Sequence, residues 1–113
     1  MEELFNKVKL FRKERGWDKF HSPKNLTMAL MVESAELAEH FQWLTEEQSG
    51  NLSPGKLVEV QEEIGDVLIY LVNLCDKLGI DPLVAAHEKL EINKGKYPVS
   101  RVRGKPNKYS EYK

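Results

Sequence analysis

The sequence predicts an all-α fold, a four-helix bundle-like domain that assembles as a homo-oligomer, and three observations support this prediction. Apolar residues recur at the third and fourth positions along four long stretches, which is the spacing of one helix face. Proline preceded by serine or aspartate begins three of these stretches, and a glycine stands near the end of three. No stretch alternates apolar and polar residues as a strand would. With 113 residues, of which 41% are hydrophobic and 31% charged, the chain is typical of one soluble domain.

The first expected helix covers residues 3–15 and ends at Gly16. Its apolar face carries Leu4, Val8 and Phe11. Residues 17–21 follow as an aromatic connection to the next helix.

The second expected helix begins with Ser22 as N-cap and Pro23 as its first residue, and it continues to about Leu44. Apolar side chains cover almost its whole circumference. One side carries Leu26, Leu30, Leu37, Phe41 and Leu44, and the other Met28, Met31, Val32, Ala35 and Ala38. Such a helix needs a partner on both sides. In a chain this short the second partner is expected to be another copy of the protein, in a dimer or a tetramer.

A polar linker, residues 45–52, separates this helix from the third, which starts at Ser53-Pro54 and ends at Gly79. Asp81-Pro82 begins the fourth helix, which is expected to end near Gly95. We expect residues 1–98 to form the domain and residues 99–113 to be an irregular basic tail. A basic tail suits phosphate groups, although such tails are more often simply solvated.

Two carboxylate pairs stand out, Glu33 with Glu36 and Glu63 with Asp66, because a spacing of three places both members on one helix face. With 18 acids in the chain, chance alone gives about three such pairs. Their position adds weight, since each pair lies within or beside an apolar stripe, where solvated acids seldom sit. If the two edges face each other, the four carboxylates need a cation. Hard oxygen ligands favour magnesium, or manganese, over zinc.

Magnesium held by carboxylates commonly takes further oxygens from substrate phosphates, which favours phosphate-ester chemistry. A di-iron centre is not expected, because His40 lacks the Glu-x-x-His spacing. The non-enzymatic alternative is a helical interaction module whose acids are surface features and whose tail touches nucleic acid.

The single cysteine, Cys75, permits no intrachain disulfide, and neither a signal peptide nor a membrane helix is predicted. A cytoplasmic protein without membrane or stable nucleic-acid partners is expected.

Four segments carry a resemblance to the all-α nucleoside triphosphate pyrophosphohydrolases of the MazG type, most closely to the dCTP pyrophosphatase branch. The segments are residues 15–21, 33–43, 62–71 and 89–98. The resemblance implies magnesium-dependent cleavage between the α- and β-phosphates of a nucleotide, either dCTP or a modified dCTP, or else dUTP or another non-canonical nucleotide. It implies metal ligands at Glu33, Glu36, Glu63 and Asp66, the residues that the spacing singles out, and a tetramer built from two dimers.

The resemblance also implies substrate contacts. Trp17, His21 and Trp43 match residues of the base pocket, and Tyr70 matches a tyrosine near the sugar or base. Phosphate ligands are implied at Lys89, Asn93, Lys96 and Tyr97. Val8 departs from the branch pattern, in which a histidine contributes to the base site.

Overall fold

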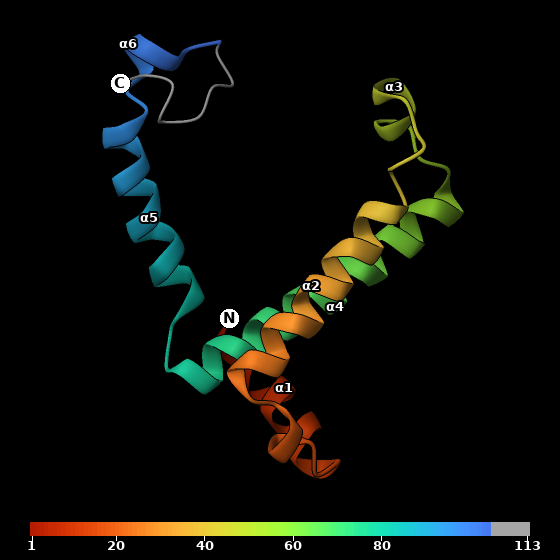
Figure 1. The fold of residues 1–113 in the computed structure, drawn as a ribbon, viewed down its shortest axis with the longest axis vertical. Coiled ribbons are helices and arrows are strands. Elements are labelled where there is room, and N and C mark those ends of the chain that lie inside the picture. The colour runs from red at the N-terminus through yellow and green to blue at the C-terminus, as the bar shows by residue number, and fades with distance from the viewer. Residues whose placement is uncertain (105–113) are drawn as a thin grey trace. The chain divides into compact units, whose positions relative to one another are not determined.

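The computed structural model describes residues 1–104, and every regular element within them is a helix, which confirms the all-α prediction for this range (Figure 1). The chain divides into two compact units, one over Met1–Ile80 and one from Asp81 onward. None of the helices in the described part is long and apolar enough to cross a membrane.

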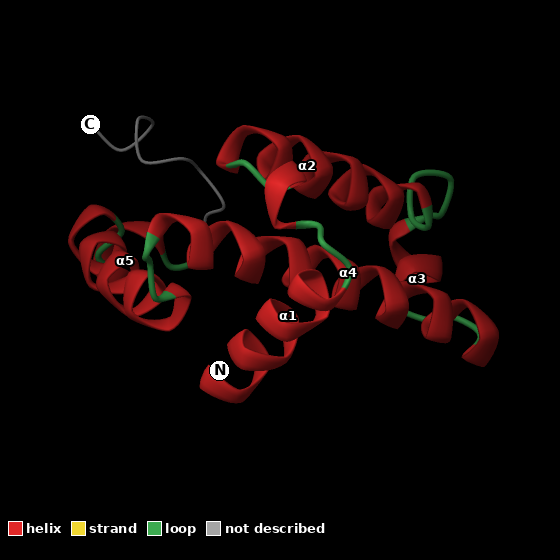
Figure 2. Cartoon of the chain, turned by 90° about the horizontal axis from the view of Figure 1, so that it is seen from below, coloured by secondary structure: helices red, strands yellow, loops and turns green. Residues whose placement is uncertain are grey.

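The first unit is built around its longest helix, α4, against which two other helices pack. Its elements are α1 (Glu2–Glu14), the 3₁₀ turn η1 (Asp18–Phe20), α2 (Pro23–Glu39), α3 (Glu46–Ser49) and α4 (Pro54–Leu78). α2 runs alongside α4, and α1 crosses α4 (Figure 2). Both carboxylate pairs therefore lie on helices that are neighbours in space.

The predicted helix starts are confirmed by their caps. The Ser22 hydroxyl accepts the Asn25 amide at the start of α2, and the Ser53 hydroxyl accepts the Lys56 amide at the start of α4. Proline follows both serines at a position whose missing N–H costs nothing. At the other end of α4, Gly79 has a φ of 68°, a left-handed conformation that favours glycine.

Three boundaries differ from the prediction. α2 ends at Glu39 rather than near Leu44, and residues 40–43 form turns. The expected linker contains the short helix α3, because Thr45 and Gln48 form a reciprocal capping box that starts a helix there. The expected irregular tail begins with the short helix α6 (Val99–Val102), and its residues 105–113 lie outside the described part.

The core of the first unit is small. Its buried apolar side chains are Val8, Leu26, Val60, Val72 and Cys75. Of the predicted apolar face of α1, Val8 is buried, whereas Phe11 is 48% exposed. The position after it, Arg12, is buried instead. Many other large apolar side chains of α2 and α4 remain exposed, a point that bears on assembly.

The second unit contains α5 (Pro82–Lys96) and α6. The Asp81 carboxylate caps α5 by accepting the Leu83 and Val84 amides, as the Asp-Pro signal predicted. α5 continues one residue past the predicted end at Gly95.

Candidate metal centre and adjoining pocket

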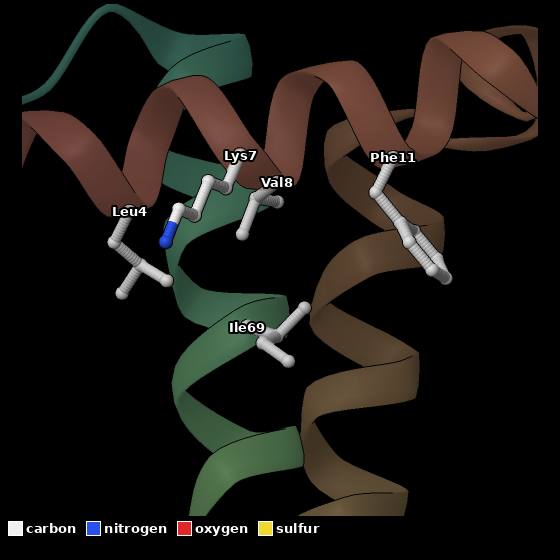
Figure 3. A pocket seen from close by; sticks show the side chains of 5 residues that line it. All are labelled: Leu4, Lys7, Val8, Phe11 and Ile69. Atoms are coloured by element: carbon white, nitrogen blue, oxygen red, sulfur yellow. The ribbon is translucent and has the colours of Figure 1, made fainter.

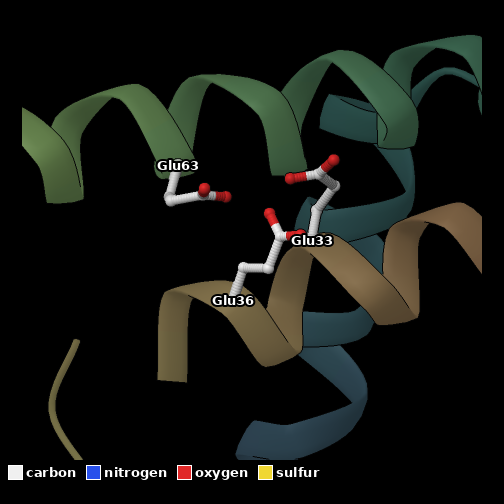
Figure 4. A group of neighbouring side chains, drawn as sticks. All are labelled: Glu33, Glu36 and Glu63. Atoms are coloured by element: carbon white, nitrogen blue, oxygen red, sulfur yellow. The ribbon is translucent and has the colours of Figure 1, made fainter. Parts of the chain in front are cut away.

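Three of the four predicted carboxylates converge between α2 and α4. Glu33 and Glu36 extend from successive turns of α2, and Glu63 extends from α4 toward them (Figure 4). One oxygen from each residue lies within 4.8 Å of the other two. Carboxylates of two pairs that are about thirty positions apart in sequence thus form one cluster, which we call the carboxylate cluster.

The carboxylate cluster is electrostatically unfavourable as it stands. Burial first, and then the adjacent Glu63 and Glu36 carboxyl groups, raise the pKa of Glu33 from its ordinary value of 4.5 to about 7. Glu33 and Glu63 each carry one buried oxygen that has no hydrogen-bond partner among the described residues. Unpaired buried oxygens of this kind are costly. An oxygen-only donor set that lacks partners fits a hard divalent cation such as magnesium, with Glu33, Glu36 and Glu63 as its ligands.

The fourth predicted ligand, Asp66, is exposed and is not one of the three converging residues. It lies one turn beyond Glu63 on α4, where it helps to line a hollow of about 250 Å³ that we call the aromatic pocket. The pocket is lined by Phe11, Arg12, Trp17, His21, Asp66, Ile69, Tyr70 and Asn73. Glu63 and Asp66 therefore link the carboxylate cluster to this pocket along one helix.

The aromatic pocket contains three of the predicted substrate contacts, Trp17, His21 and Tyr70. The ring of Trp17 meets that of Phe11 edge to face, with centroids 5.6 Å apart, and it lies 6.3 Å from the His21 ring. Burial, and then the positive charges of Arg12 and Lys77, lower the pKa of His21, so its imidazole is neutral at pH 7. Flat aromatic faces beside polar groups are suited to a nucleobase.

The other predicted substrate contacts are not among the residues that line this pocket. Trp43 is in the turn after α2 and is 86% exposed. Lys89, Asn93 and Lys96 lie along α5, and Tyr97 follows as its C-terminal cap, all within the second unit.

Sequence reasoning missed Arg12 and Asn73, two buried polar residues of the pocket wall. A signal was present for each. Arg12 follows Val8 by four positions and so continues the apolar face of α1, while Asn73 interrupts the apolar end of α4 between Val72 and Leu74.

A second hollow, of about 230 Å³, lies where α1 crosses α4 (Figure 3). Leu4, Val8 and Phe11 extend from α1 and Ile69 from α4, and Lys7 also lines it. Phe11 and Ile69 belong to both hollows. Val8, the position that departs from the branch pattern, thus adds an apolar surface beside the aromatic pocket.

The chain is similar to known proteins over most of its length. The chain is 44% identical over 103 residues to dCTP pyrophosphatase 1 of Homo sapiens and 42% identical to that of Mus musculus, matches that cover 89% of this chain. They cover 61% of each relative, so the chain spans less than two thirds of the length of these proteins. A pyrophosphatase of Archaeoglobus fulgidus has a similar crystal structure, with a TM-score of 0.83 and 46% identity over 87% of this chain and 92% of that one. Residues 28–112 match the MazG-like family, and the chain belongs to that family.

Proposed function

We propose that this protein is a magnesium-dependent nucleoside triphosphate pyrophosphohydrolase, which cleaves dCTP or a modified dCTP between the α- and β-phosphates to give the monophosphate and pyrophosphate. The observation that carries the proposal is the carboxylate cluster, in which two buried oxygens lack partners among the described residues. Its residue Glu63 lies on α4 one turn before Asp66, which lines the aromatic pocket. The similarity to dCTP pyrophosphatase 1 supports the choice of substrate.

In this proposal Glu33, Glu36 and Glu63 hold the metal, and Asp66 adds a fourth carboxylate on the pocket side of Glu63. Bound magnesium supplies Lewis-acid polarisation of phosphate oxygens and a more acidic water. The carboxylates fix its position, and one that is not needed as a ligand acts as the general base that takes the proton of the attacking water.

The base is held in the aromatic pocket, where Trp17 offers a face for stacking and Tyr70 a hydroxyl. His21, neutral at pH 7, offers one ring nitrogen as donor and the other as acceptor. We also propose Trp43 as a base contact. Lys89, Asn93, Lys96 and Tyr97 are proposed as phosphate ligands because the first three follow one face of α5 at intervals of four and three residues.

A nucleotide panel tests the reaction and the substrate separately. With magnesium, dCTP and 5-methyl-dCTP should yield equal amounts of monophosphate and pyrophosphate, and chelation by EDTA should abolish the yield. CTP, dUTP, dTTP, dATP and dGTP complete the panel. If none of these nucleotides is cleaved with magnesium or manganese, the proposed pyrophosphohydrolase activity is refuted. Preference for dUTP would refute only the cytosine assignment.

The raised pKa of Glu33 predicts how magnesium binding depends on pH. Between pH 4.5 and 7 the folded metal-free protein holds a proton on Glu33 that the unfolded chain has lost, so this group's contribution to stability falls as pH rises through that range. Magnesium must displace the proton, which weakens its binding about tenfold at pH 6 relative to pH 8. At a fixed, subsaturating magnesium concentration, we expect a larger rise in Tm at pH 8 than at pH 6.

Differential scanning fluorimetry with and without magnesium measures this difference. Glu33→Gln should remove the part of the pH dependence of the metal-free Tm that protonation of Glu33 causes. Equal magnesium shifts of the wild-type Tm at pH 6 and pH 8 would contradict the prediction.

We further propose that the protein acts in the cytoplasm, where its one thiol, the buried Cys75, stays reduced, and that it acts as a homo-oligomer. The exposed apolar side chains of α2 and α4 support the second point.

A further inference from the structure

The Arg12 side chain is hydrogen-bonded to three other side chains of the first unit. It is 4% exposed, and its guanidinium uses all three nitrogens. Nε donates to Asp18, Nη2 donates to Asp76, and Nη1 donates to the Asn73 Oδ1 at 2.9 Å. The residue thus joins α1 to η1 and to the C-terminal part of α4.

Asp18 is held from a second side by α4. The Lys77 ammonium lies 3.2 Å from the Asp18 carboxylate and 3.4 Å from the Asp18 carbonyl oxygen. Backbone hydrogen bonds continue the connection, since the Trp17 amide donates to the Arg12 carbonyl at 3.0 Å and the His21 amide to the Asp18 carbonyl at 3.2 Å. The two pocket residues of this segment therefore flank a residue that is ion-paired to both neighbouring helices.

Apolar burial does little to hold the same segment. None of the η1 residues is buried, Phe20 is 60% exposed, and Trp17 is 42% exposed. Apolar contacts stabilise in proportion to the area they remove from water, so this segment gains little from them. The segment is held mainly by polar contacts, which are the ion pairs of Asp18, the hydrogen bond from the Asn25 side-chain amide to the Phe20 carbonyl and the backbone hydrogen bonds.

Arg12 is buried, but its partner Asp18 keeps 39% of its side chain exposed and Asp76 keeps 24%. Such a network contributes little to stability by itself, because solvent weakens the attraction of the exposed charges and desolvation of Arg12 offsets part of the rest. What such a network provides is a fixed geometry, here the geometry of two walls of the aromatic pocket. Arg12 and Asn73 also line this pocket, so the network and the site share one boundary.

We propose that Arg12 is a positioning residue for nucleotide recognition, which through Asp18 holds residues 17–21 against α4 so that Trp17 and His21 form the wall that receives the base. The inference rests on the proposed function. It implies that loss of the ion pairs from Asp18 to Arg12 and Lys77 weakens nucleotide binding more than it slows the chemical step. The reason is that the carboxylate cluster lies on other turns of α2 and α4.

Asp18→Asn tests the proposal without leaving Arg12 unpaired, since Asp76 and Asn73 still accept from it. We expect KM for dCTP to rise about tenfold while kcat stays within about twofold. Glu14→Gln is the matched control, because it removes one exposed carboxylate of the same region, and its KM should equal that of the wild type. Arg12→Lys should raise KM as well, because an ammonium cannot replace three diverging donors.

A second measurement needs no turnover. In a Trp43→Phe background, acrylamide quenching reports on Trp17 alone, and Asp18→Asn should increase it where Glu14→Gln does not. Unchanged KM, or a loss confined to kcat, would overturn the proposal, as would unchanged quenching. If the wild type cleaves no nucleotide the proposed function fails, and the quenching result still decides whether Asp18 fixes the position of Trp17.

Discussion

Replacement of Glu63 by glutamine should remove magnesium-dependent pyrophosphate release and at the same time raise the Tm of the metal-free protein. An amide is a poor magnesium ligand, and loss of one of three converging carboxylates should cost about 4 kcal/mol of transition-state stabilisation, or about a thousandfold in kcat/KM. The Tm should rise because the variant no longer brings three acidic groups together in a partly buried site. These opposite changes distinguish a metal centre from a purely structural cluster.

Glu62→Gln is the control, because Glu62 is the exposed neighbour of Glu63 on α4 and the substitution changes the charge equally. It should alter neither activity nor Tm appreciably. Pyrophosphate release by Glu63→Gln within tenfold of the wild-type rate would show that the carboxylate cluster is not the catalytic metal site. An equal loss in Glu62→Gln would show that the effect is one of net charge.

The helices and the carboxylate cluster were accessible from the sequence because they follow from local rules. Ser22 and Ser53 mark helix starts through contacts three residues away, and an interval of three between Glu33 and Glu36 is enough to place them on one face. The capping box of α3 obeys the same kind of rule. It was missed because the surrounding residues have no apolar periodicity, not because its signal was absent.

The Arg12 network was not accessible in this way, since its partners Asn73 and Asp76 lie 61 and 64 positions along the chain. Only the packing of α1 across α4 brings them together. The position of Asp66 shows a related limit. An interval of three from Glu63 predicts that Asp66 lies on the same helix face. The two side chains still point in directions about 60° apart, so that Glu63 enters the carboxylate cluster while Asp66 lines the aromatic pocket.

The apolar surface of α2 is the strongest indication that the chain associates with itself. Met28, Met31 and Val32 follow one face of the helix and are 53%, 60% and 52% exposed. Leu57, Ile64 and Leu68 do the same on α4, with 55%, 52% and 38% exposed. Monomeric soluble proteins seldom leave so much of two helices uncovered. In a two-fold symmetric dimer, the same apolar patch of each chain packs against that of the other chain, so a single patch is enough to form the interface.

Met31→Glu should therefore dissociate the proposed homo-oligomer into single chains. A carboxylate at the centre of an apolar interface must lose its hydration without gaining a partner, at a cost of several kcal/mol, and symmetry introduces the charge once per chain. Light scattering coupled to size-exclusion chromatography should give a mass near the 13.1 kDa of one chain, against a multiple of it for the wild type. The Tm should fall and become less dependent on protein concentration, because association stabilises the folded chain by mass action.

Asn6→Glu introduces the same charge at an exposed position of α1 and should leave the mass unchanged. A wild-type protein that elutes as a single chain would contradict the proposal directly. A Met31→Glu variant that keeps the wild-type mass would show that this face of α2 is not the interface, and the exposed face of α4 would then be tested in the same way. Because Glu33 and Glu36 project from the same helix toward α4, dissociation at Met31 also tests whether the carboxylate cluster keeps its magnesium affinity within one chain.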